Sequence, residues 1–145
     1  MLEDMLVKDN ISIVYEKLTW EEAIITAITP LVLSGCVEER YGRAIIESTK
    51  KYGAYYILTK DIALLHSKPE EGVKRRQMGI TLVKEGVIFP GKSEPIKLLI
   101  VLAAVDNEGH IDAMKDIADL IIDKRRIGEI LNAESVEKIY EGLSL

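Results

Sequence analysis

Residues 62–73 read Ile62-Ala63-Leu64-Leu65-His66-Ser67-Lys68-Pro69-Glu70-Glu71-Gly72-Val73, and they mark the place where a strand of this chain ends. Four apolar residues are followed by a histidine and then by a segment with the proline and glycine of a turn. This order predicts a buried strand whose last side chain, His66, emerges at the rim of a sheet. Because sites often form at such rims, His66 is a candidate for chemistry, and a partly buried structural histidine is the alternative.

The chain has two histidines, and the second occupies a similar position. His110 follows Asp106-Asn107-Glu108-Gly109, which come directly after a strongly apolar run at residues 98–105. It therefore lies where an expected strand ends and an expected helix begins. Two histidines at strand ends can converge on one site.

The predicted sheet contains one long apolar segment and several short ones. Residues 96–105 are apolar almost throughout, as expected of a central strand covered by helices on both faces. Shorter strands are expected at residues 54–58, 62–65, 78–83 and 87–89, with a turn at residues 84–86 between the last two. On this interpretation the sheet begins late in the chain.

Helices are expected before and after these strands. Thr19 and Glu22 have the spacing of a capping box, so a helix begins near Thr19, and Pro30 is expected to kink or shorten it. A second helix is expected to end at Gly53. From residue 111 onward the apolar spacing predicts one longer and two shorter helices. The predicted fold class is α/β, a single-domain sandwich over residues 1–145 with a mixed central β-sheet flanked by helices on both faces.

The composition is ordinary for a globular protein and argues against several classes of function. The 145 residues are 48% hydrophobic and 30% charged, which suits one domain with a full core. The formal net charge of -5 argues against nucleic acid as a partner. No apolar run is long enough to cross a bilayer. A single cysteine, Cys36, and the lack of a leader segment predict a cytoplasmic protein without an internal disulfide.

The chemistry available to these residues centres on the two histidines. There is no glycine-rich phosphate loop, dinucleotide fingerprint, paired-cysteine zinc spacing or Gly-x-Ser-x-Gly motif, so we expect no cofactor. A neutral imidazole nitrogen is a nucleophile toward phosphorus when a hydrogen bond on the other nitrogen fixes its tautomer. His66 is the better placed nucleophile, while His110 adds a donor beside free backbone N–H groups at a helix start. A metal site with Glu108 or Asp106 stays open as a minor alternative, although the ligand spacing is not a standard one.

Residues 51–73 resemble the active-site region of the enzyme IIA component (EIIA) of bacterial sugar phosphotransferase systems (PTS), of the mannitol/fructose type. The family pattern is Gly-Pro-Tyr, then Ala-x-Pro-His, then Arg-Pro-Glu-x-Gly-Val. The corresponding residues here are Gly53-Ala54-Tyr55, Ala63-Leu64-Leu65-His66 and Lys68-Pro69-Glu70-Glu71-Gly72-Val73. The resemblance continues through residues 19–23 and 103–110, so it covers nearly the whole chain, and it is closest to the ascorbate branch.

This resemblance implies a phosphotransferase component with a phosphohistidine intermediate. It implies that the phosphocarrier protein HPr phosphorylates His66, that His110 is the second active-site histidine, and that the phosphoryl group passes to a cysteine of an EIIB partner. The membrane component EIIC would be engaged only indirectly, in the uptake of an ascorbate-like carbohydrate. Two other roles are compatible with the sequence: a regulatory paralogue whose His66 phosphorylation state controls a partner protein, and a binding module that keeps the fold without being phosphorylated.

The chain departs from the family pattern at several positions without losing a reacting group. Ala54 and Leu65 stand where the family has proline, and Lys68 stands where it has arginine. Leu65 restores a backbone N–H and removes the φ restriction that a proline would impose just before His66. The Arg-Glu pair that the mannitol and fructose branches carry in the second helix appears here as Ser48-Thr49, which favours the ascorbate branch.

Overall fold

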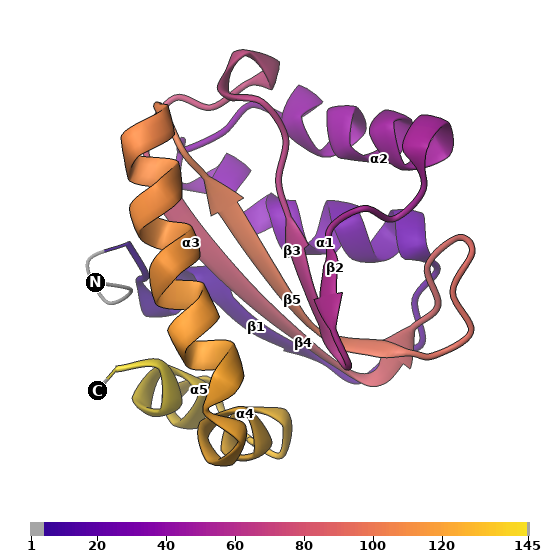
Figure 1. The fold of residues 1–145 in the computed structure, drawn as a ribbon, viewed down its shortest axis with the longest axis vertical. Helices are drawn as coiled ribbons and strands as arrows, with labels where there is room; N and C mark the ends of the chain where they lie inside the picture. The colour runs from indigo at the N-terminus through magenta and orange to yellow at the C-terminus, as the bar shows by residue number, and fades with distance from the viewer. Residues whose placement is uncertain (1–4, 145) are drawn as a thin grey trace.

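A five-stranded mixed sheet forms the centre of the structure, a computed structural model that describes residues 5–144 (Figure 1). In spatial order the strands are β1 (Ile11–Val14), β4 (Gln77–Val87), β5 (Ile96–Ala103), β3 (Ile62–Leu65) and β2 (Ile57–Thr59). The central strand β5 runs antiparallel to β4 and parallel to β3. As predicted, the long apolar segment is therefore the middle of a mixed sheet.

Helices cover both faces of this sheet, which confirms the predicted fold class. Figure 1 shows α3 crossing one face, with α1 and α2 on the other side. The bounds are Trp20–Leu33 for α1, Arg40–Tyr52 for α2, Asn107–Ile122 for α3, Lys124–Leu131 for α4 and Val136–Leu143 for α5. Two short 3-10 helices, η2 (Lys8–Asn10) and η3 (Pro69–Glu71), complete the described elements. Within residues 5–144, no helix combines the length and apolar character needed to cross a membrane.

The side chains of β5 alternate between two apolar cores. Leu99 and Val101 belong to the core beneath α1 and α2, whereas Leu98 and Ile100 belong to the core beneath α3, α4 and α5. All four are fully buried. Each such side chain contributes about 1.5–3 kcal/mol of hydrophobic stabilisation, so β5 is held firmly in place by both layers.

The first helix begins where its capping box predicts. Thr19 accepts a hydrogen bond from the backbone N–H of Glu22, and the Glu22 side chain accepts one from the N–H of Thr19. Pro30 lies inside α1 and does not end it, because the helix continues to Leu33. After the helix ends, Gly35 adopts a left-handed conformation with a φ of 78°. This conformation allows the N–H of Cys36 to donate a hydrogen bond to the carbonyl of Leu31.

Three predictions about the sheet are wrong. The strand expected at residues 54–58 begins only at Ile57, because residues 55 and 56 form a turn. The sheet does not begin late in the chain, since β1 pairs in parallel with residues 80–83 of β4. This strand has only four residues, and its partner lies far away in sequence, so the local pattern gives little indication of it. Residues 84–86 are not a turn between two strands, because β4 runs through them. Gly86, with a φ of 78°, lies in the irregular part of the pairing between Leu82 and Val87, which lets the strand continue.

The helix that carries His110 begins earlier than its apolar residues suggest. α3 starts at Asn107, and Asp106 is its N-cap. The capping side chain, and not the first apolar residue, determines where this helix begins. His110 consequently lies in the first turn of α3, near the end of β5. The two shorter C-terminal helices, α4 and α5, are present as predicted.

Candidate active site

His66 follows directly after β3, and its ring is held by a hydrogen bond to its own strand. The Nδ1 atom lies 2.7 Å from the carbonyl oxygen of Leu64. Because a carbonyl oxygen can only accept, we assign the proton of the neutral ring to Nδ1, which leaves the lone pair on Nε2. The structure thus supplies a hydrogen bond of the kind that makes one imidazole nitrogen available as a nucleophile.

The ring of His110 lies beside that of His66. Their centroids are 5.7 Å apart and their planes are tilted by 52°. Burial lowers the pKa of His110, and the nearby imidazole of His66 lowers it further. His110 is therefore mostly neutral at pH 7 and carries a single ring N–H. The sequence placed both histidines at strand ends, and the structure brings them together.

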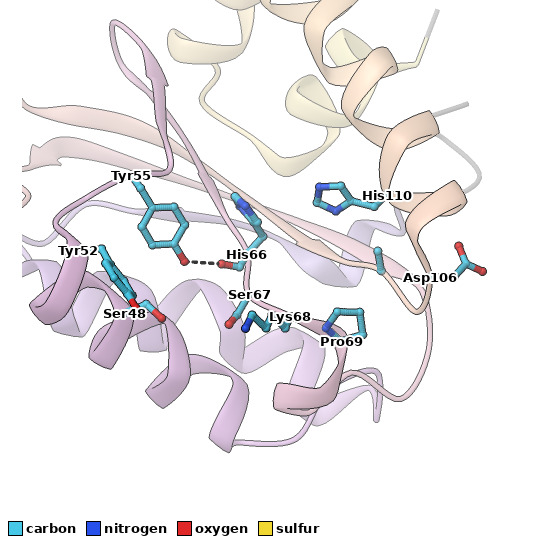
Figure 2. Close-up of a pocket in the computed structure, with 10 residues that line it drawn as sticks. Ser48, Tyr52, Tyr55, His66, Ser67, Lys68, Pro69, Asp106 and His110 are labelled. Atoms are coloured by element: carbon cyan, nitrogen blue, oxygen red, sulfur yellow. Dashed lines mark hydrogen bonds between the residues drawn. The ribbon is translucent and has the colours of Figure 1, made fainter.

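Both rings line an open pocket with a volume of about 520 Å³. Figure 2 shows the rings of Tyr55, His66 and His110 arranged along this pocket. The lining residues come from α2, from the loop before β2, from the segments after β3 and β5, and from the first turn of α3: Ser48, Tyr52, Tyr55, His66, Ser67, Lys68, Pro69, Ala104, Asp106 and His110. The turn predicted after His66 thus forms one wall of the pocket.

Tyr55 contacts His66 in two ways, which the sequence did not predict. Its ring meets the imidazole edge-on, with centroids 5.7 Å apart and an interplanar angle of 84°. Its hydroxyl donates a hydrogen bond to the carbonyl oxygen of His66, at 3.0 Å (Figure 2). Partial burial raises the pKa of Tyr55, and a hydrogen bond with the Ser48 side chain lowers it by less. Tyr55 stays protonated at neutral pH and remains a donor.

The start of α3 offers fewer free donors than expected. The Asp106 carboxylate accepts a hydrogen bond of 2.7 Å from the N–H of Gly109, and the Asp106 carbonyl accepts one of 3.2 Å from the N–H of His110. The first of these bonds is made by the cap and the second is the first bond of the helix itself, so neither N–H is free for an anion. The ring of His110 is the better candidate for a donor in this turn.

The departures from the family pattern have different structural consequences. Leu65 is fully buried in β3, opposite Val101 of β5. Ser48 lines the pocket, whereas Thr49 is buried and its hydroxyl bonds to the carbonyl of Ile45 and to the Tyr56 hydroxyl. Where other branches have an Arg-Glu pair, this chain therefore presents one neutral hydroxyl to the pocket. Lys68 is an exposed cation at the pocket wall.

The alternative of a metal site finds no support in the arrangement of these side chains. Within the described residues 5–144, no three His, Cys, Asp or Glu side chains gather closely enough to hold a metal ion. Figure 2 shows the Asp106 carboxylate pointing away from the two imidazole rings.

The fold and the site together define an α/β protein with a histidine pair at an open pocket. This class of protein is suited to carrying a group on a histidine nitrogen. The chain belongs to the EIIA 2 family of the phosphoenolpyruvate-dependent sugar phosphotransferase system, whose family model matches residues 4–144. It is thus a PTS component of the phosphocarrier family, as the sequence predicted.

Three relatives illustrate the similarity. The chain is 36% identical over 143 residues to the mannitol-specific cryptic phosphotransferase enzyme IIA component of Escherichia coli K12, covering 99% of this chain and 97% of the relative. The solution structure of that enzyme IIA from Escherichia coli superposes with a TM-score of 0.92 and again covers 99% of this chain and 97% of the relative. An ascorbate-specific PTS EIIA component of Salmonella choleraesuis is 29% identical, with 97% and 93% covered.

The third relative was solved together with a partner. It is the mannitol enzyme IIA of Escherichia coli, whose structure is a complex with phosphorylated mannitol enzyme IIB. This enzyme IIA is 29% identical to the chain, with a TM-score of 0.81 and 96% of each chain covered. The family model and the 36% identical relative show the family. They do not single out the ascorbate branch, because the mannitol-type cryptic component is more similar than the ascorbate-specific one, at 36% against 29% identity.

Proposed function

We propose that this protein accepts a phosphoryl group from phosphorylated HPr on Nε2 of His66 and passes it to a cysteine of an EIIB partner. The observation that carries the proposal is the 2.7 Å contact between Nδ1 of His66 and the carbonyl of Leu64. In the first step the Nε2 lone pair attacks phosphorus, a phosphorus–nitrogen bond forms, and the bond to the donor breaks. In the second step the cysteine sulfur attacks, and the electron pair of the broken bond returns to Nε2.

We assign His110 the role of a donor to the phosphoryl oxygens. Its ring lies 5.7 Å from that of His66, centroid to centroid, on the side of the pocket formed by α3. Because its pKa is lowered, it supplies a neutral N–H at pH 7, and a donor aimed at developing charge stabilises the transition state. Lys68, which also lines the pocket and is exposed, adds a positive charge there.

The surroundings of the pocket suit brief contacts with protein partners. Four exposed apolar or aromatic side chains either line the pocket or directly neighbour a lining residue in the sequence: Tyr52, Tyr55, Val105 and Ile111, with exposed fractions of 68%, 45%, 47% and 63%. A carrier that binds a donor and an acceptor in turn needs an interface that releases readily. The mannitol relative solved with its phosphorylated enzyme IIB supports a partner of the EIIB class.

We further propose that the transported substrate is an ascorbate-like carbohydrate and that the protein works in the cytoplasm. The neutral Ser48 in the pocket, in place of an arginine, supports the ascorbate assignment. The higher identity to the mannitol-type cryptic component speaks for the mannitol branch.

Label transfer tests the carrier role and the branch together. The protein is phosphorylated through HPr and then mixed in parallel with ascorbate-type and mannitol-type EIIB domains. Faster transfer to the ascorbate-type domain supports the proposed branch, and faster transfer to the mannitol-type domain overturns it while keeping the carrier role. Failure to acquire label from phosphorylated HPr would overturn the carrier role itself.

A further inference from the structure

The peptide bond between His66 and Ser67 is held from two sides by tyrosine hydroxyls. On one side, the Tyr55 hydroxyl donates to the carbonyl oxygen of His66 at 3.0 Å. On the other, the backbone N–H of Ser67 donates to the Tyr41 hydroxyl at 2.9 Å. Both polar atoms of one peptide unit are therefore bonded to side chains from different parts of the fold. A peptide held at both atoms cannot rotate without breaking a hydrogen bond.

Tyr41 connects this peptide to the centre of the sheet. Its side chain is fully buried, and its hydroxyl lies 2.9 Å from the carbonyl of Leu102 near the end of β5 and 3.3 Å from the carbonyl of Ser67. The hydroxyl has one proton, which it donates to a carbonyl while its oxygen accepts from Ser67. Burial raises the pKa of Tyr41 to about 12, so the proton is retained at neutral pH. α2, β5 and the segment after β3 thus meet at one hydroxyl.

The departure at position 65 makes this double contact important. A proline there would restrict the backbone just before His66, and Leu65 does not. The ring of His66 is fixed to Leu64 by the Nδ1 hydrogen bond, but that bond holds the ring only if the backbone on either side of His66 is also fixed. Residues before His66 are fixed by the pairing of β3 with β5. Residues after it are fixed by the two tyrosines.

We infer that Tyr41 and Tyr55 are positioning residues, which clamp the 66–67 peptide so that Nε2 of His66 faces an incoming phosphoryl group. The inference rests on the proposed function, since it concerns the reach of the same nucleophile. Neither tyrosine needs to exchange a proton or contact phosphorus. Their effect is on orientation, and displacements of about 1 Å in a reacting group can cost roughly a hundredfold in rate.

The test uses single-turnover transfer from phosphorylated HPr to the Tyr41→Phe and Tyr55→Phe variants. The matched control is Tyr56→Phe, because Tyr56 is as buried as Tyr41 and loses a hydrogen bond to Thr49, which does not involve the 66–67 peptide. We expect the maximal rate to fall by at least about tenfold in each clamp variant, with the half-saturating HPr concentration changed by less than about twofold, and Tyr56→Phe to keep the parent's rate. Parent-like maximal rates in either clamp variant would overturn the two-sided clamp.

A second measurement separates failure of the clamp from failure of the carrier role. Amide hydrogen exchange and the ring resonances of His66 are recorded by NMR for the unphosphorylated proteins. We expect faster exchange of the Ser67 amide in Tyr41→Phe, and shifted His66 ring resonances in both clamp variants but not in Tyr56→Phe. If the parent takes no phosphoryl group, the proposed function fails, but these spectra still test whether the two tyrosines hold the 66–67 peptide. Unchanged spectra in the clamp variants would refute that positioning role.

Discussion

His66 and His110 lie side by side but are held in different ways. His66 is fixed by a ring hydrogen bond to Leu64, and the peptide that follows it is bonded on both sides. The ring of His110 contacts that of His66 and has no hydrogen-bond partner within the described part of the chain. The end of β3 thus presents an imidazole with a defined tautomer, whereas the ring in the first turn of α3 is still unpaired. This difference supports the two roles that we propose.

Removing the nucleophile should have the largest effect. His66→Ala should take up no phosphoryl group from phosphorylated HPr, because no other group in the pocket has a nitrogen lone pair fixed in this way. The side chain is only partly buried, so the variant should stay folded. The measurement is label uptake, with circular dichroism to verify the fold. If the variant is labelled as well as the parent, His66 is not the residue that accepts the phosphoryl group, and the proposed roles of the two histidines are wrong.

Removing the donor should slow the transfer without preventing it. His110→Ala is expected to reduce the transfer rate by roughly 10²-fold, the cost typical of losing one donor to a developing negative charge. His110→Gln is the matched control, since its amide can still donate a hydrogen bond and should recover part of the rate. Rapid-quench kinetics measure both. A His110→Ala variant as inactive as His66→Ala would show that the two histidines do not differ in role as described.

The pH response of His110 refines the comparison. Its pKa is lowered from the ordinary 6.5, first by burial and then by His66. The unfolded chain therefore binds more protons at this position just below pH 6.5, so the stability contributed by the neutral ring is present above that pH and is lost as the pH falls toward the folded pKa.

NMR titration of the His110 ring checks both causes. In His66→Ala the pKa should rise toward 6.5 but stay below it, because burial remains the larger cause. Phosphorylation of His66 should also raise it, since a negative charge nearby favours the imidazolium. A His110 pKa at or above 6.5 in the unphosphorylated parent would contradict the description of its ring as a neutral donor.

The smallest effect should come from a site remote from both histidines. Thr19→Ala removes one half of the capping box of α1 and should lower the free energy of unfolding by about 1 kcal/mol. The transfer rate of the folded protein should stay the same, which separates stability from activity. Chemical denaturation and the label assay measure the two quantities. A changed transfer rate at full folding would mean that the start of α1 is coupled to the pocket.

The sequence predicts well what depends on local pattern. The strand that ends at His66 and the cap at Thr19 are encoded by neighbouring residues, and both are where the pattern places them. β1 is missed because its pairing with β4 joins distant parts of the chain. The hydrogen bonds of Tyr41 and Tyr55 to the 66–67 peptide also join residues that are distant in sequence. Such a bond between a side chain and a remote backbone atom leaves no periodic pattern, so the sequence does not predict it. Tyr55 does match the tyrosine of the family's Gly-Pro-Tyr pattern, but that match says nothing of its hydrogen bond to the 66–67 peptide.

The most direct test of the account is to identify the phosphorylated atom. The protein is labelled with ¹⁵N in its histidine rings, phosphorylated through HPr, and examined by NMR for the ring nitrogen that is bonded to phosphorus. Because Nδ1 of His66 donates to Leu64, we predict that the phosphoryl group is on Nε2 of His66, with Nδ1 still protonated. A phosphoryl group on Nδ1 of His66, or on either nitrogen of His110, would contradict the assignment of nucleophile and donor.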